Sequence, residues 1–234
     1  MITISAFKWV PPFAQGQVRD LRVRWALEEA GLPYRARLID TDDQASADYR
    51  AHQPFGQVPV FEEDDLVLFE TGSIVLHIGA RSEALLPADA AARARAITWL
   101  FAALNSIEVA IQPLAEIDLF HADKDWAKQR RPDAEQKARR RLKELAAWLG
   151  DRDYLENRFT VGDLMMTTVL RIARHTDLVA AEPKLAAYQA RCEARPAFQR
   201  ALRDQLAAFE QRRTHSSMIP KSGYRFSEKI MLQQ

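Results

Sequence analysis

Cysteine is nearly absent from this sequence, and its scarcity excludes two kinds of structure. The 234 residues contain one cysteine, Cys192, so neither an intrachain disulfide nor a metal site built from several cysteines can form. Disulfides persist in oxidising compartments and are rare in the cytosol. The single thiol therefore predicts a cytoplasmic protein.

An excess of either charge is also lacking. Lys and Arg number 33 and Asp and Glu number 32, which gives a formal net charge of +1. Proteins that bind nucleic acid or an anionic membrane surface need a concentrated excess of positive charge. We therefore expect neither of these partners.

Long apolar runs are missing as well. No run of about 18 apolar residues occurs, and residues 1–13 lack a basic start followed by a long apolar stretch. The five histidines share no spacing typical of metal ligands. The sequence thus predicts no membrane span, no secretion signal and no metal.

What is present divides the chain into two parts. Residues 1–82 mix strand-like and helical patterns, whereas residues 90–210 are rich in Ala, Arg and Leu at helical spacing. The strand that follows the first helix is expected to lie parallel to the first strand, and the last two strands are expected to form an antiparallel hairpin. In the first part we expect strands over 2–7, 34–39, 57–62 and 66–69 and helices over 18–30, 45–51 and 73–79.

The second part predicts five or six helices followed by a tail. Thr160 and Asp163 stand three residues apart before an apolar run, which predicts a capping box with Asp in place of Glu. Residues 211–234 contain five Lys or Arg and one Glu, a charge of 5 − 1 = +4, and show no sustained period. This tail is apolar enough that we expect it to pack back onto the body of the protein. One long helix is indicated by apolar residues at spacings of three and four: Ile97, Leu100, Leu104, Ile107, Ile111 and Leu114.

Three segments, in this order, resemble the glutathione S-transferase superfamily. They are LRVRWALEEAGLPY at residues 21–34, the pair PFGQVPVF and LFETGSI at residues 54–61 and 68–74, and FTVGD at residues 159–163. The resemblance covers about residues 1–210. It implies an α/β thioredoxin-like N-terminal domain (1–82) that binds glutathione, an all-α C-terminal domain (90–210) that forms the pocket for a second substrate, and a homodimer.

The resemblance also implies which residues bind glutathione. Pro59 lies within an apolar strand pattern, where its missing N–H removes a ladder hydrogen bond, and a cis Val58–Pro59 bond at the sheet edge accounts for this. In the family, the backbone before this proline pairs with the cysteinyl part of glutathione, and Gln57 is assigned to the glycyl end. Glu70 suits the γ-glutamyl ammonium, whereas Thr71 and the first N–H groups of its helix suit the carboxylate.

The group that activates the sulfur is not apparent in the sequence. Relatives carry Tyr, Ser or Cys after the first strand, but residues 9–17 (WVPPFAQGQ) contain neither a hydroxyl nor a thiol. Counting back from Gly31 places the Ser or Cys position at Gln17 and the Cys position of another class at Arg19. We therefore predict that Gln17, Arg19 and the start of the first helix stabilise the thiolate.

The second-substrate pocket is expected to receive aromatic and polar side chains from both domains. Part of this set forms a stripe on the long helix, for which a dimer contact is the alternative. The implied activity is a detoxifying conjugation of glutathione thiolate to an electrophilic, fairly apolar small molecule, and the alternative is a non-catalytic binding or regulatory protein with the same fold. The expected pocket residues are Trp9, Phe13, Phe101, Asn105 and Glu108, with Gln112 next on the stripe.

Overall fold

The computed structural model describes the backbone of residues 1–216 and the side chains of residues 1–210. Most of the tail expected over residues 211–234, including its packing on the body, lies outside these described residues. The last helix, α10 (Pro196–Ser216), continues to Ser216, so the first six residues of the expected tail are helical instead.

A four-stranded sheet forms the first layer of the molecule. Its strand order is β2-β1-β3-β4; β1 pairs parallel with β2 and antiparallel with β3, and β3 pairs antiparallel with β4. This confirms the predicted pairing. The third strand begins only at Phe61, because Pro59 has no N–H to give to a ladder and the Val60 N–H donates to the side chain of Ser5 instead of to a backbone carbonyl. The strands are β1 (Ile2–Phe7), β2 (Tyr34–Ile39), β3 (Phe61–Glu63) and β4 (Leu66–Leu68).

Four helices accompany the sheet. The first ends at Gly31, which adopts a left-handed φ of 65° that glycine accepts without steric cost, and Pro33 follows. Asp40 and Ser46 cap the next two helices with their side chains. Gly72 and the start of the fourth helix lie against Leu104 of the second domain. The helices are α1 (Asp20–Ala30), α2 (Thr41–Ala45), α3 (Ala47–His52) and α4 (Thr71–Gly79).

The second layer is entirely helical in the residues described, which confirms the predicted fold class. Asp89 caps its first helix, since Asp89 Oδ2 accepts from the Ala92 N–H at 2.8 Å. The capping box predicted at Thr160 and Asp163 is present. The elements are α5 (Ala90–Ala102), a π-helical segment η1 (Ala103–Glu108), α6 (Val109–Phe120), α7 (Asp125–Leu149), α8 (Val161–Leu170), a short 3₁₀ segment η2 (Arg171–Ala173), α9 (Pro183–Glu193) and α10.

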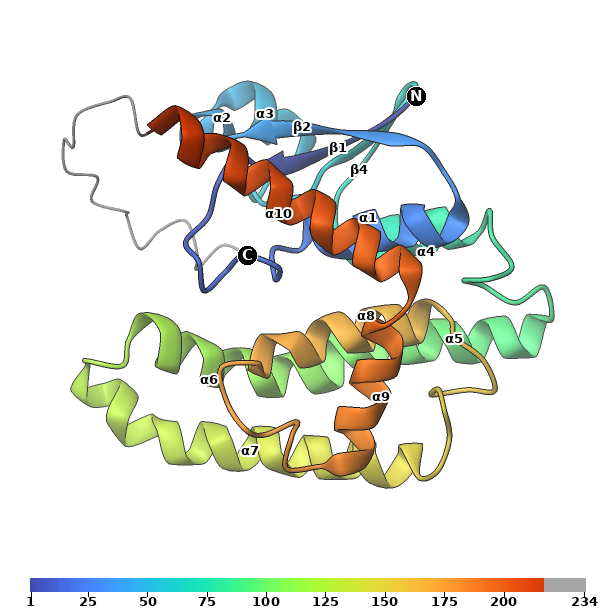
Figure 1. The fold of residues 1–234 in the computed structure, drawn as a ribbon, viewed down its shortest axis with the longest axis vertical. Coiled ribbons are helices and arrows are strands. Elements are labelled where there is room, and N and C mark those ends of the chain that lie inside the picture. The colour runs from blue at the N-terminus through green and yellow to red at the C-terminus, as the bar shows by residue number, and fades with distance from the viewer. Residues whose placement is uncertain (217–234) are drawn as a thin grey trace.

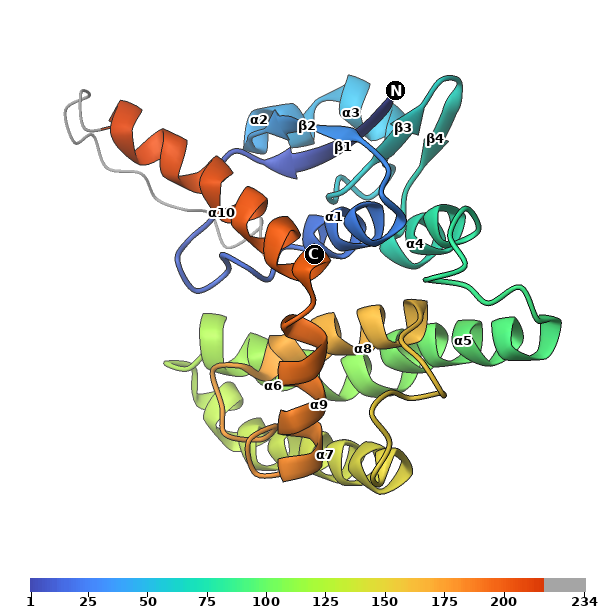
Figure 2. The same cartoon turned by 45° about the vertical axis from the view of Figure 1, so that its right-hand side comes forward.

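The two layers share one hydrophobic core. Figure 2 shows α1 and α4 between the sheet and the helices α5 and α8. The buried ring of Trp25 lies 4.8 Å from Phe198 and 5.6 Å from Phe159, measured between ring centroids. In Figure 1, α10 runs back from the helical layer and lies along α1. Continuous packing of this kind fixes the positions of the two layers relative to each other.

One helical stretch is apolar enough to merit comparison with a membrane span. The stretch Ala90–Phe120 passes a test of length and composition, with a mean hydropathy of 1.3 in its best window. Its side chains at Leu100, Ile111 and Leu114 are buried in the shared core. About a third of the window, 33%, is buried, and length and composition alone are weak grounds for a membrane span.

Candidate functional site

The segment between α3 and β3 contains the cis Val58–Pro59 bond that the sequence predicts. A chain of hydrogen bonds holds the residues on both sides of it. The Val60 N–H donates to Ser5 Oγ at 2.7 Å, Ser5 Oγ lies 2.8 Å from Tyr49 Oη, and Tyr49 Oη donates to the Gln57 carbonyl at 2.6 Å. Because a carbonyl can only accept, the Tyr49 hydrogen must point at Gln57, and Ser5 must donate to Tyr49.

This chain of hydrogen bonds uses both hydroxyls. Ser5 and Tyr49 are buried, and burial raises the pKa of Tyr49 to about 12. Neither side chain is therefore free to act on a bound sulfur. Their role is to hold the backbone of residues 57–60.

Replacing Tyr49 by Phe should destabilise this segment. We expect Tyr49→Phe to lower the free energy of unfolding by about 1–3 kcal/mol, since the half-buried Gln57 carbonyl and the buried Ser5 hydroxyl lose their partner. Urea unfolding measures the loss. The double variant with Ser5→Ala should lose less than the sum of the two single losses, because both hydroxyls belong to one chain. Additive losses would contradict the chain.

The N-terminus of α4 presents an unusual backbone. Glu70 adopts φ 68° and ψ 114°, and its carboxylate makes no capping hydrogen bond to the helix. A positive φ at a residue other than glycine costs roughly 1–3 kcal/mol and is concentrated at functional sites. Glu70 is exposed, so its carboxylate can meet a ligand at the start of α4.

A cluster of charged side chains connects α4 with α1 and with η1. The buried Arg22 donates to Thr71 Oγ1 at 3.2 Å and to Glu108 Oε2 at 2.9 Å. The second carboxylate oxygen of Glu108 accepts from Arg19 at 2.5 Å. Arg22 is 3% exposed and Glu108 is 7% exposed. The cluster of Arg19, Arg22 and Glu108 thus carries two positive charges and one negative charge, a balance of +1.

Burial and charge act in opposite directions on this cluster. Burial alone would raise the pKa of Glu108, but the charges of Arg22 and Arg19 outweigh it and leave the pKa lowered. Burial also lowers the pKa of Arg22, and the nearby Glu108 opposes that effect. We infer that Glu108 is ionised at neutral pH and that its negative charge stabilises the positive charges of the two guanidinium groups.

A cavity lies between the loop after β1 and the helices of the second domain. The loop side includes both residues predicted to stabilise the thiolate, Gln17 and Arg19, together with Phe13. Phe13 meets Phe120 edge to face across the cavity, with 5.4 Å between ring centroids. The lining residues are Phe13, Ala14, Gln17, Val18, Arg19 and Arg22 on one side and Gln112, Ala115, Leu119, Phe120 and Ile172 on the other.

The predicted stripe on the long helix is split by η1. Phe101 is 48% exposed and Asn105 is also exposed, whereas Glu108 is buried against α1 and Gln112 lines the cavity. A π-helical segment widens one turn and rotates the residues that follow it. Phe101 and Asn105 are not among the residues that line this cavity, and their contact with a second substrate stays a prediction.

The predicted role of Trp9 in the second-substrate pocket stays a prediction. Trp9 packs beside a small buried cluster that includes Phe7, Val10 and Phe209, and among the described residues it is not one of those lining the cavity. The single cysteine, Cys192, lies buried in the helical layer, and burial raises the pKa of its thiol to about 12. It is no candidate for a nucleophile in the cavity.

Comparison with known proteins bears directly on this site. The family model "Glutathione S-transferase, N-terminal domain" matches residues 14–80, and "Glutathione S-transferase, C-terminal domain" matches residues 107–196. Glutathione S-transferase 3 of Zea mays is 33% identical over 197 residues, which span 77% of this chain and 86% of that protein. The chain belongs to the glutathione S-transferase superfamily. Three other plant glutathione S-transferases align over only 32% to 45% of their own length.

Solved glutathione S-transferases share the fold. The theta class enzyme of Xanthomonas axonopodis pv. citri, solved with glutathione bound, is 27% identical, with a TM-score of 0.71 over 86% of this chain and 96% of that one. A glutathione transferase family member from Pseudomonas fluorescens pf-5, solved with two glutathione molecules bound, is 25% identical, with a TM-score of 0.75 over 86% and 92%.

Within this glutathione S-transferase fold, three of the predicted residues line the cavity, namely Phe13, Gln17 and Arg19, whereas the predicted glutathione-binding residues lie outside its lining. Thr71 meets Arg22, which lines the cavity beside Gln17 and Arg19, and Glu70 adjoins Thr71. Sequence reasoning missed Arg22. Its position three residues after Arg19 could have revealed it, because this spacing places both guanidinium groups on one face of the helix.

Among the described residues, no three His, Cys, Asp or Glu side chains gather in a group that could hold a metal ion.

Proposed function

We propose that this glutathione S-transferase homologue conjugates the thiolate of glutathione to an electrophilic, fairly apolar small molecule. The observation that carries the proposal is that both residues predicted to stabilise the thiolate, Gln17 and Arg19, line one cavity, and that wall residues of this cavity contact or pack with predicted glutathione-binding residues. Arg22 lines the cavity and donates to Thr71, and Val18, which also lines it, shares a buried cluster with Val58. In this proposal Gln57 binds the glycyl end, the backbone of Val58 binds the cysteinyl part, and Glu70 and Thr71 bind the γ-glutamyl end.

The charge of the cavity supports thiolate chemistry. A thiolate is stabilised by a nearby cation, by polar donors and by a helix N-terminus. Arg19 stands at the N-cap of α1, and Gln17 lies two residues before it on the same wall of the cavity. The excess positive charge of the cluster has the sign that such a thiolate requires. The apolar wall formed by Phe13, Leu119, Phe120 and Ile172 suits an apolar second substrate.

The second candidate function is a glutathione-binding protein without transferase activity. Two observations favour it: residues 9–17 contain no hydroxyl or thiol, and Glu108 already neutralises part of the charge of Arg19. The two functions differ in the state of the bound sulfur. In a transferase the bound thiol titrates below free glutathione, which absorbance near the thiolate band measures across a pH series; an unchanged thiol pKa favours the binding protein.

Glu70→Ala should weaken glutathione binding. We expect a loss of about 1.5–3 kcal/mol, the range for a hydrogen bond to a charged group, because the ligand ammonium loses its carboxylate. Isothermal titration calorimetry measures the loss. Asp65→Ala, which removes an exposed carboxylate from the turn between β3 and β4, serves as the matched control and should bind as the wild type does. Equal affinity of the Glu70 variant and the control would remove Glu70 from the site.

The remaining elements of the proposal concern the assembly and the compartment. We propose a cytoplasmic homodimer without a metal, a nucleic acid or a membrane as partner. The grounds are the single cysteine, the balanced charge and the dimeric assembly typical of the family. The exposed Phe101 and Asn105 then belong to the dimer face, the alternative that the sequence left open. Light scattering of the purified protein measures its mass in solution.

A further inference from the structure

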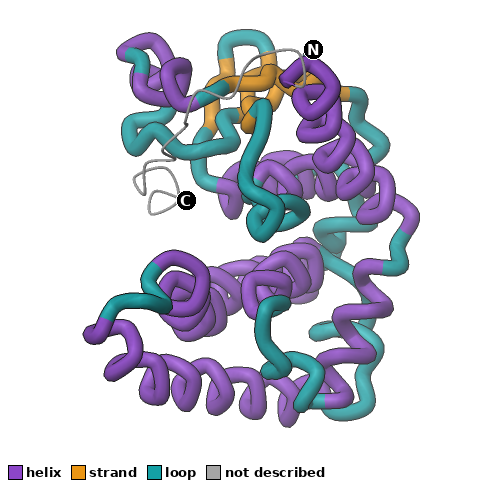
Figure 3. The backbone as a smooth tube through the Cα atoms, turned by 60° about the vertical axis from the view of Figure 1, so that its left-hand side comes forward, coloured by secondary structure: helices purple, strands orange, loops and turns teal. Residues whose placement is uncertain are grey.

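The loop between β1 and α1 forms one wall of the cavity, and two arginines of the other domain bind its backbone. Figure 1 and Figure 3 show this loop descending from the strands toward the helical layer. Arg174 Nη2 donates to the carbonyls of Phe13 and Gln15, both at 2.7 Å. Arg171 donates to the carbonyl of Gly16 from Nη2 at 2.8 Å and from Nε at 3.1 Å. Two guanidinium groups thus bind three loop carbonyls, and we call these contacts the clamp.

Arg171 is itself fixed by the body of the helical layer. Its side chain is 11% exposed, it pairs with Glu193 at 2.9 Å, and its guanidinium lies 5.2 Å from the ring centroid of Phe198. Arginine presents its donors in a rigid planar fork, so a fixed guanidinium also fixes the groups that it binds.

The loop fits closely against both arginines. Gly16 has a φ of +77°, and a Cβ atom added there would lie 3.2 Å from Arg171 Nη2 and 3.3 Å from Arg174 Nη1. Partial burial against the loop, together with the charge of Arg171, lowers the pKa of Arg174. The two side chains accept this arrangement because the loop carbonyls supply their hydrogen-bond acceptors.

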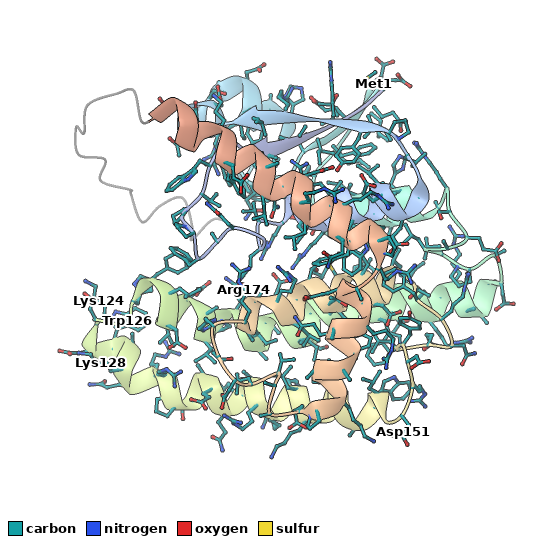
Figure 4. All side chains as sticks on the ribbon, in the orientation of Figure 1. Met1, Lys124, Trp126, Lys128, Asp151 and Arg174 are labelled. Carbon is teal, nitrogen blue, oxygen red and sulfur yellow. The ribbon has the colours of Figure 1, made fainter. Side chains whose placement is uncertain are left out.

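The contacts between the two arginines and the loop lie next to the residues proposed to stabilise the thiolate. Figure 4 shows Arg174 in the space between the loop and the helical layer. Ile172, which lies between the two arginines in the chain, lines the cavity opposite Phe13 and Gln17. Gln17 directly follows Gly16, so any movement of the clamped carbonyls moves Gln17 and the start of α1.

We propose that Arg171 and Arg174 are positioning residues, which set the distance between the loop and the helical layer and thereby hold Gln17 and the N-terminus of α1 at the sulfur of glutathione. This inference rests on the proposed function. Neither guanidinium needs to touch the substrate, because each acts through the loop backbone. Loss of the clamp should therefore affect the bound thiol and the rate more than the affinity for glutathione, whose predicted contacts at Glu70, Thr71 and residues 57–60 stay in place.

Arg174→Met tests the clamp with the least risk to folding, because Arg174 is exposed outside its contacts with the loop. With chlorodinitrobenzene as the electrophile, we expect kcat to fall roughly 10- to 100-fold, the size of effect that a misplacement of about 1 Å produces. The pKa of the bound thiol should rise toward that of free glutathione, and the affinity for glutathione should change less than about 3-fold by the same argument. Added methylguanidine should restore part of the rate of Arg174→Ala.

Arg139→Met is the matched control, since it removes an arginine that pairs with Glu135 along α7. Hydrogen exchange at the amides of residues 13–17 tests the clamp without any ligand, and Arg174→Met should accelerate it while the control should not. A wild type that binds no glutathione would end the proposed function, and the exchange result would still decide whether the clamp exists. Unchanged exchange, or an unchanged kcat and thiol pKa in the folded variant, would overturn the inference.

Discussion

Glu108→Ala should lower the free energy of unfolding by about 3–5 kcal/mol, the cost of removing one partner from a buried ion pair. Arg22 is buried, and without Glu108 its charge keeps only the hydroxyl of Thr71 and no carboxylate at hydrogen-bond distance. Arg19 loses the same partner. The cluster joins α1 with η1, so the lost stability comes from contacts between the two domains. Urea unfolding followed by circular dichroism measures it.

Two further variants make the expectation specific. Glu144→Ala breaks the exposed pair with Arg141 on α7 and should cost no more than about 1 kcal/mol, as surface pairs do. Combining Glu108→Leu with Arg22→Met removes both buried charges, and apolar replacements of a buried pair are often neutral. The double variant should thus be more stable than Glu108→Ala. A Glu108→Ala loss equal to that of Glu144→Ala would contradict a buried ion pair.

The fold could be predicted from the sequence because its signals are local. Gly31 and Pro33 end α1, Asp89 begins α5, and Thr160 begins α8, each through contacts within a few residues along the chain. Alternating and helical periods then determine which elements form, and the short connections determine how the strands pair. The π-helical η1 escaped this reasoning, since its residues continue an α-helical pattern of apolar side chains.

The site could be predicted only in part, because its decisive contacts join residues far apart in the sequence. The pattern at residues 54–74 predicts Val58, Glu70 and Thr71 as glutathione-binding residues. It could not show that Arg22 reaches both Thr71 and Glu108, or that Ser5 lies beside Tyr49, since each partner lies more than 40 residues away. The sequence shows directly that residues 9–17 contain no hydroxyl or thiol. It does not show what holds this loop, because the arginines that bind it follow α8, far along the chain.

Asp163→Ala should destabilise the helical layer as strongly as the change at Glu108. The carboxylate of Asp163 is fully buried; Oδ1 accepts from the Leu155 N–H and the Tyr188 hydroxyl, both at 2.9 Å, and Oδ2 accepts from the Thr160 N–H at 3.0 Å. Alanine leaves three buried donors without an acceptor. At roughly 1–3 kcal/mol for each unsatisfied group, we expect a loss of about 3–5 kcal/mol in urea unfolding after partial relaxation.

Thr160→Ala is the natural comparison for this loss. It removes only the hydroxyl that caps the Gly162 N–H, and a lost N-cap costs about 0.5–2 kcal/mol. The larger loss at Asp163 therefore reports its contacts with the Thr160 N–H, Leu155 and Tyr188, of which the last two tie the loop before α8 and the helix α9 to the capping box. Equal losses at Asp163 and Thr160 would mean that these three contacts contribute little.

The same carboxylate predicts how stability depends on pH. Burial raises the pKa of Asp163 from 3.8 to about 6, although its hydrogen bonds oppose the shift. Between these two values the folded chain binds a proton that the unfolded chain does not, so the stabilisation from this group is complete below pH 3.8 and is lost as the pH rises through about 6. At about 1.4 kcal/mol for each unit of pKa shift, the wild type should lose roughly 2–3 kcal/mol relative to Asp163→Asn between about pH 4 and pH 7. Urea unfolding of both proteins across this range measures the difference, in which the titration of all other groups cancels. A difference that stays constant with pH would mean that the hydrogen bonds from Leu155, Thr160 and Tyr188 outweigh burial and keep Asp163 ionised throughout.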